Sequence, residues 1–138
     1  MRNIRIMYQY DGSKYYGFQR QKNKDTVQGD IEKIVFSKFN EKINMTSSGR
    51  TDRGVHALGQ VSNFSISKRI PLDAIKQQIN KTLRGKVKIL SIEEIRENFN
   101  ARFDAKRRTY LYVLKNESKI TPFEAPYVTS IKEEIDVD

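Results

Sequence analysis

The chain has 138 residues, no cysteine, a single histidine and a formal net charge of +9. Without cysteine it has no disulfide, thiolate nucleophile or zinc-finger ligand set, and one histidine alone does not favour a transition-metal site. The length suits one domain with a hydrophobic core, and the charge predicts a polyanionic partner without distinguishing RNA, DNA or a membrane surface.

The positive charge is concentrated in the first half. Residues 1–69 hold 13 Lys and Arg residues against six Asp and Glu, whereas residues 70–138 hold 13 against 11. A polyanion-binding surface is therefore expected mainly in the first half, together with the cluster at residues 106–108. No stretch approaches the ~20 apolar residues that span a bilayer, and the N-terminus enters a strand-like pattern without an apolar signal core. We expect a cytoplasmic protein with no membrane partner.

In chain order, residues 2–10 alternate in polarity, which is typical of a strand. A turn at residues 11–13 and a lysine-rich loop follow. From residue 26 onwards the apolar residues recur at helical spacing, and Asp25 or Thr26 is the expected cap. These residues are Val27, Ile31, Ile34, Val35 and Phe39. Strands are then expected over residues 42–48 and 59–67.

The second half predicts a helix that begins at Pro71 and ends at Gly85, followed by strands over 86–95 and 106–115. This order predicts an α+β, ferredoxin-like βαββαβ fold: an antiparallel sheet with two helices on one face and an extra strand, the architecture that RNA-recognition modules also use. We expect residues 1–116 to form one α/β unit. Residues 117–138, with two prolines and an acidic end, are predicted to be a linker or tail.

One loop stands out for its chemistry. Residues 49–61 read GRTDRGVHALGQV and place Asp52 between Arg50 and Arg53, just before a predicted strand. Neighbouring positive charges keep a carboxylate ionised, so Asp52 would act as a nucleophile or base rather than as an acid. The alternative is a turn former whose side chain bonds the local backbone.

Two further strings accompany this loop: YDGSKYYGFQRQ at residues 10–21 and ARFDAKRRTYLY at residues 101–112. In this order, the three strings resemble the TruA family of transfer-RNA pseudouridine synthases, and the resemblance runs through the whole chain. It implies an isomerase that converts uridine to pseudouridine at positions 38, 39 and 40 of the tRNA anticodon stem-loop, with no cofactor or metal. Asp52 would be the nucleophile, attacking either the base or the sugar carbon.

The resemblance implies two further catalytic roles. Tyr110 matches the tyrosine that stacks on the target base, although the alternation of the predicted strand is equally compatible with ordinary sheet packing, which we favour for Tyr112. Arg50 matches an arginine that assists base flipping, and a simple phosphate contact is a compatible role.

Other residues of these strings are expected to shape the loop or to contact RNA. Loop-shaping residues are Gly49, Thr51, Gly54 and His56, of which His56 would bond the loop backbone or contact RNA. Candidate phosphate contacts are Lys14, Arg20, Lys22, Lys24, Arg53, Arg107 and Arg108. The aromatic residues of the first string, Tyr15, Tyr16 and Phe18, would stack on RNA or anchor the loop to the core, and we favour anchoring.

Members of the family are considerably longer and carry a second half of similar fold that completes the catalytic cleft. We therefore expect this chain to be the N-terminal part only, missing its C-terminal half and a poor catalyst alone, because water in an open cleft weakens electrostatic contacts. An uncovered sheet edge predicts self-association, for instance as a homodimer. The alternatives are a non-catalytic RNA-binding module of the same fold, and a basic interaction domain whose binding would not depend on salt.

Overall fold

The computed structural model describes residues 1–51, 54–104, 114–116 and 129–131. The chain comprises two units, Met1–Arg108 and Thr109–Asp138. The first unit contains, in order, β1 (Arg2–Tyr10), the 3₁₀ turn η1 (Gly12–Lys14), α1 (Val27–Phe39), β2 (Thr46–Ser47), β3 (Ala57–Ile66), α2 (Leu72–Thr82) and β4 (Val87–Ile95). In the second unit β5 (Leu114–Asn116) pairs in parallel with β6 (Thr129–Ile131).

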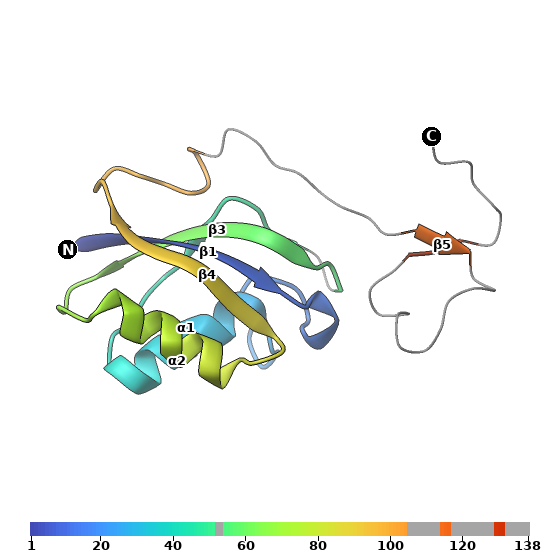
Figure 1. The fold of residues 1–138 in the computed structure, drawn as a ribbon, viewed down its shortest axis with the longest axis horizontal. Helices are drawn as coiled ribbons and strands as arrows, with labels where there is room; N and C mark the ends of the chain where they lie inside the picture. Colours follow the sequence, from blue (N-terminus) through green and yellow to red (C-terminus); the bar gives the residue numbers. More distant parts are fainter. Residues whose placement is uncertain (52–53, 105–113, 117–128, 132–138) are drawn as a thin grey trace. The chain divides into compact units, whose positions relative to one another are not determined.

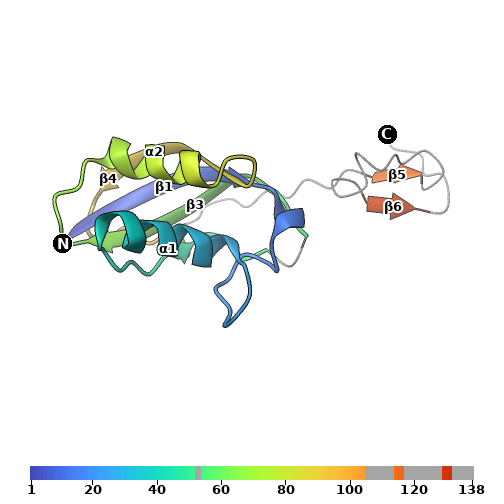
Figure 2. The same cartoon turned by 90° about the horizontal axis from the view of Figure 1, so that it is seen from below.

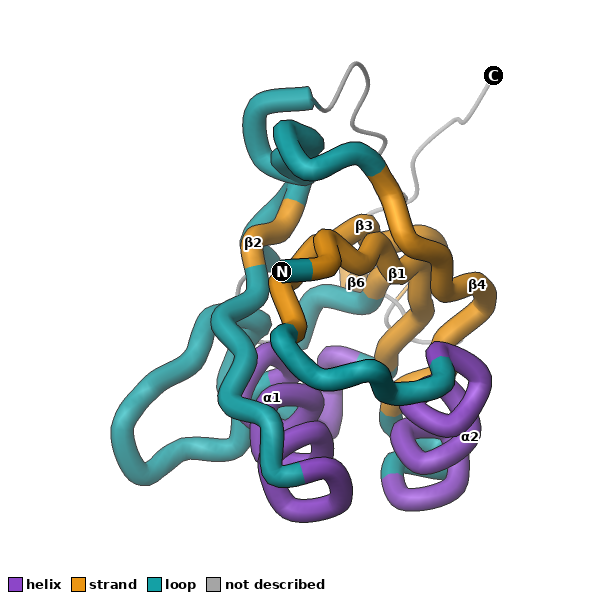
Figure 3. Tube along the Cα trace, turned by 90° about the vertical axis from the view of Figure 1, so that its left-hand side faces the viewer, coloured by secondary structure: helices purple, strands orange, loops and turns teal. Residues whose placement is uncertain are grey.

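The four strands of the first unit form an antiparallel sheet in the order β2-β3-β1-β4 (Figure 1). Both helices lie on the same side of this sheet (Figure 3) and run next to each other along the strands (Figure 2). This arrangement confirms the predicted ferredoxin-like α+β fold. Of the extra strand expected over 106–115, residues 106–113 lie outside the described residues.

Alternation along β1 builds the centre of the core. Ile4, Ile6 and Tyr8 have no exposed surface and Tyr10 is 4% exposed, so these four side chains share the face covered by the helices. The predicted apolar face of α1 meets them, because Val27, Ile31 and Val35 are fully buried. Thr26 caps α1 by accepting a hydrogen bond from the Gly29 N–H at 3.2 Å, which settles the choice between the two expected caps.

The strand expected over 42–48 is shorter than predicted. Ile43 and Met45 are buried, as the alternation requires, but only Thr46 and Ser47 pair with β3. The Met45 N–H donates to Glu32 Oε2 at 2.9 Å. Since the Ser48 N–H donates to the Val61 carbonyl oxygen in the register of β2 and β3, the Met45 N–H lies on the outer edge of β2, and this bond ties that edge to α1. The other strands and helices of the first unit begin and end within about three residues of the predicted positions.

The chain leaving β4 folds over the sheet face opposite the helices (Figure 3). The Asn3 amide donates to the carbonyl oxygens of Arg96 and Phe99, each at 3.0 Å, and the Ala101 N–H donates to Asn63 Oδ1 at 2.8 Å. These bonds hold residues 96–104 against β1 and β3. In the part of the chain that the structure describes, no helix has the length and apolar character to cross a membrane.

Candidate catalytic loop and adjoining groove

The loop between β2 and β3 carries the candidate nucleophile. Its residues Gly49–Thr51 and Gly54–His56 are described, whereas Asp52 and Arg53 lie outside the described residues. The predicted site residues Tyr110, Arg107 and Arg108 also lie outside them. The geometry of the loop is therefore given by its two flanks.

The first flank is bonded to the string at residues 10–21 and to β3. The Tyr10 hydroxyl lies 2.6 Å from Thr51 Oγ1, and the Phe18 N–H donates to the Thr51 carbonyl oxygen at 3.1 Å. On the other side, Gln60 Nε2 donates to the Gly49 carbonyl oxygen at 2.8 Å. Tyr10 is 4% exposed and Phe18 2%, so buried groups fix the residue directly before Asp52.

The second flank is bonded to the η1 turn. The Gly12 N–H donates to His56 Nδ1 at 2.9 Å, which requires an unprotonated Nδ1. Asp11 Oδ1 lies 3.3 Å from the same nitrogen and also accepts bonds from the N–H and hydroxyl of Ser13. A Cβ on Gly12 would lie 2.0 Å from the Val55 carbonyl oxygen, so the turn and the loop are in direct backbone contact.

Gly54, directly after the two undescribed positions, has a φ of +83°, and no atom of the described residues lies within 4 Å of where a Cβ would stand. A conformation that L side chains resist, rather than lack of space, accounts for glycine here. In the string at residues 10–21, Tyr15 and Phe18 are buried in the core, as anchoring requires, while Tyr16 is 46% exposed.

The basic residues of this string differ in their surroundings. Lys14, Lys22 and Lys24 are exposed. Arg20 instead pairs with Glu32 at 2.9 Å, and the carboxylate side chain is only 8% exposed. A structural ion pair therefore competes with the phosphate contact expected of Arg20.

Glu32 is a residue that the sequence interpretation missed. Besides Arg20, it accepts hydrogen bonds from Gln28 Nε2 at 3.1 Å and from the Met45 N–H. Gln28 Oε1 in turn accepts from the Arg20 N–H at 3.2 Å. This network joins α1, the 18–20 segment and the approach to β2. Gln28 and Glu32 are polar residues four positions apart beside the apolar face of α1, and this spacing could have indicated the network in the sequence.

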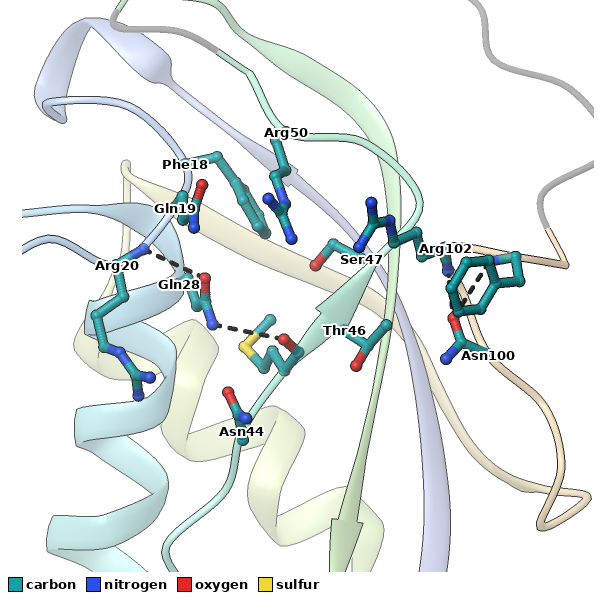
Figure 4. A pocket seen from close by; sticks show the side chains of 12 residues that line it. Phe18, Gln19, Arg20, Gln28, Asn44, Thr46, Ser47, Arg50, Asn100 and Arg102 are labelled. Atoms are coloured by element: carbon teal, nitrogen blue, oxygen red, sulfur yellow. Dashed lines mark hydrogen bonds between the residues drawn. The ribbon is translucent and has the colours of Figure 1, made fainter.

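A groove of about 350 Å³ opens beside this network (Figure 4). Arg50 lines it, and Figure 4 shows its guanidinium directed toward Ser47 at the end of β2. Among the described residues no group of three or more His, Cys, Asp or Glu side chains could hold a metal ion.

Two buried phenols near the loop do not ionise at ordinary pH. Burial raises the pKa of the Tyr8 hydroxyl far above its usual range. Burial, and then the nearby Asp30 carboxylate, do the same for the pKa of Tyr15. Neither side chain can serve as a phenolate base.

Comparison with known proteins identifies a family. A family model described as tRNA pseudouridine synthase matches residues 6–104, which include the Asp52 loop but end before Tyr110. Relatives called tRNA pseudouridine synthase A include that of Caldicellulosiruptor bescii, 40% identical over 100% of this chain and 57% of the relative. That of Dictyoglomus thermophilum is 42% identical over 100% of this chain and 57% of the relative. That of Brachyspira hyodysenteriae is 45% identical over 92% of this chain and 51% of the relative. The chain thus spans about half the length of the curated relatives it matches.

Proposed function

Because this chain belongs to the family of tRNA pseudouridine synthases, we propose that it carries the nucleophile of an isomerase that converts uridine to pseudouridine in tRNA. The observation that carries this proposal is the family match over residues 6–104, which spans the string around Asp52. The substrate positions are uridines 38, 39 and 40 of the anticodon stem-loop, as the resemblance of the three strings implies.

In the proposed reaction the N-glycosidic bond breaks, the uracil rotates and C5 joins the ribose. Asp52 is the nucleophile, kept ionised by the neighbouring Arg50 and Arg53. Tyr110 stacks on the target base, and Arg50 assists the flipping that brings a paired uridine out of its stem. No metal or cofactor takes part.

The contacts of the loop support this role. A nucleophile lowers a barrier only when it is held in place before the reaction, because misplacement by about 1 Å costs on the order of 100-fold in rate. Thr51 and His56, on either side of Asp52, are bonded to Tyr10 and Gly12, respectively. Such bonds hold the two described flanks of the loop in place without substrate.

The remaining wall of the cleft comes from elsewhere. Since the chain spans about half of its curated relatives, we propose that a second half of the family fold, or another copy of this chain in a homodimer, covers the site and excludes water. We also propose a cytoplasmic location, where such an enzyme meets its tRNA substrate.

Nucleoside mapping of an unmodified tRNA transcript tests the proposal. The wild-type chain should form pseudouridine at positions 38–40, and changing one of these uridines to cytidine should remove the product at that position alone. Asp52→Asn should abolish all product. Asp73→Asn, an exposed carboxylate in the first turn of α2, is the matched control and should behave as wild type.

A parallel RNA-binding measurement separates the alternative functions. Binding that weakens steeply with salt, without any pseudouridine, would indicate a non-catalytic RNA-binding module or a chain that needs a second half of the family fold to act. Binding that does not depend on salt would point to the basic interaction domain without an RNA role.

A further inference from the structure

The groove next to the candidate loop lies within the first unit and has a volume of about 350 Å³. This is at the small end of the ~300–1,000 Å³ range of small-molecule sites, the scale of a single nucleotide rather than of a duplex. Its walls come from the 18–20 segment, α1, the approach to β2 and the turn at 100–103. The lining residues are Phe18, Gln19, Arg20, Gln28, Asn44, Met45, Thr46, Ser47, Arg50, Asn100, Arg102 and Phe103.

The charge of the lining favours an anion. Among its described residues are three arginines and no carboxylate. Arg20 is paired with Glu32, whereas no described carboxylate forms an ion pair with Arg50. Arg50 and Arg102 appear on either side of Ser47 in Figure 4, so positive charge is distributed along the groove. Arginine guanidinium groups are suited to phosphate recognition.

The turn at 100–103 presents an aromatic ring. Phe103 is 77% exposed, although its backbone is fixed: Asn100 Oδ1 accepts hydrogen bonds from the N–H groups of Arg102 at 2.9 Å and Phe103 at 3.2 Å. The Arg102 guanidinium lies 5.5 Å from the centre of the Phe103 ring. An exposed ring with an adjacent arginine on a fixed turn is a surface on which a nucleobase can stack.

The polar groups of the lining add the means to bind a base edge. Asn44, which is exposed, has an amide that can both donate and accept, and Thr46 and Ser47 supply hydroxyls. Single-stranded RNA bases are recognised by this combination of stacking and edge contacts. An acidic peptide would pair with the arginines but would leave the exposed Phe103 ring without a stacking partner.

We propose that this groove binds one unstacked nucleotide of the substrate RNA outside the reaction centre, with its base on Phe103 and its phosphate at Arg102. The inference rests on the function proposed above. Arg50, also in the lining, is two residues from Asp52, so the occupant is a neighbour of the target uridine along the RNA. The contact would help to select which uridine enters the site.

The test measures binding of the full chain to a fluorescently labelled anticodon stem-loop RNA, and to a series in which one nucleotide at a time is abasic. Phe103→Ala should weaken binding of the intact RNA about tenfold. Phe36→Ala, which removes a ring that is 54% exposed on α1, is the matched control and should leave it unchanged. Arg102→Gln should lower the slope of log K against log salt by about 0.7, one single-strand phosphate contact, while Arg84→Gln, just beyond α2, should not.

The abasic series gives a result that general destabilisation would not. One abasic position should weaken wild-type binding about tenfold and have no further effect on Phe103→Ala, because both changes remove the same stacking contact. Additive losses at every position, or wild-type affinity in both Phe103→Ala and Arg102→Gln, would overturn the inference and leave the proposed function standing. Absence of RNA binding by the wild-type chain would overturn both.

Discussion

The Tyr10 hydroxyl lies 2.6 Å from Thr51 Oγ1, a contact between residues 41 positions apart. The Gly12 N–H makes the equivalent contact with His56 on the far side of Asp52, at 2.9 Å over 44 positions. The end of β1 and the η1 turn therefore hold both flanks of the candidate catalytic loop. Residues of the string at 10–21 therefore hold the loop at residues 49–56 by hydrogen bonds. In the proposed reaction the first string would help to position Asp52.

Tyr10→Phe should lower the rate of pseudouridine formation about tenfold, since the loop loses the bond next to Asp52 and misplacement of a reacting group is costly. Its free energy of unfolding should fall by only about 0.5–1.5 kcal/mol, the net contribution of one hydrogen bond. Single-turnover kinetics and thermal unfolding check the two quantities.

Tyr8→Phe is the matched control for this change. Tyr8 lies two residues earlier on the same face of β1, and its hydroxyl lies 2.7 Å from Ser62 Oγ of β3 rather than from a residue next to Asp52. It should lose comparable stability and keep the wild-type rate. Equal rate losses in both variants would show that the contact with Thr51 has no special role.

Gly12→Ala should disturb the loop more strongly. The added methyl group would stand 2.0 Å from the Val55 carbonyl oxygen, a backbone atom, and relieving such a clash typically costs ~1–3 kcal/mol. We expect a rate loss of roughly 100-fold. Gly59→Ala places no described atom within 4 Å of the new carbon and should change stability by less than ~0.5 kcal/mol. A wild-type rate for Gly12→Ala would show that the contact between the η1 turn and the loop does not position Asp52.

Arg20→Gln separates the structural role of this residue from its role as a phosphate contact. Its loss leaves the nearly buried Glu32 without its charged partner, which should cost ~1–3 kcal/mol of unfolding free energy. If the ion pair is its main role, RNA affinity measured well below the melting temperature stays at the wild-type value. A reduced salt slope with unchanged stability would instead assign Arg20 to a phosphate.

Glu41 should make stability depend on pH. The pKa of its carboxyl is lowered chiefly by the hydrogen bond that it accepts from the Ser67 N–H. A lowered pKa in the folded state means that the stabilisation is present above the pKa of the unfolded chain and is lost as the pH falls through the folded value. As the pH falls from about 6 to about 3, the free energy of unfolding should therefore decrease less in the Glu41→Gln variant than in wild type. Glu97→Gln, on the exposed turn after β4, should retain the wild-type dependence.

Much of the fold could be predicted because its pattern is local. Alternation in β1 and helical spacing in α1 and α2 come directly from which side chains are buried, and the order of elements then leaves the ferredoxin-like arrangement. The length of β2 could not be predicted in this way. The alternation of buried residues extends back to Ile43, although only Thr46 and Ser47 pair with β3, and no periodicity within one segment indicates where its pairing with a distant strand ends.

For the site too, local sequence patterns were predictive and contacts between distant segments were not. The three strings indicate the family, which the family match over residues 6–104 confirms, and they also indicate the candidate site residues. They do not indicate that Gly12 rests against Val55 or that Phe103 shares a groove with Asn44, because such contacts join segments that only the folded sheet brings together. The roles of Asp52, Arg50 and Tyr110 stay predictions.

The most direct test of the account is tritium release from tRNA labelled at C5 of uridine, because joining C5 to the ribose expels the hydrogen at that carbon. We predict release by the wild-type chain and none by Asp52→Ala, with RNA binding retained in both. Equal release from both proteins would contradict the claim that Asp52 is the nucleophile, whereas no release from the wild-type chain while it binds the RNA would show that the chain needs a second half of the family fold to act.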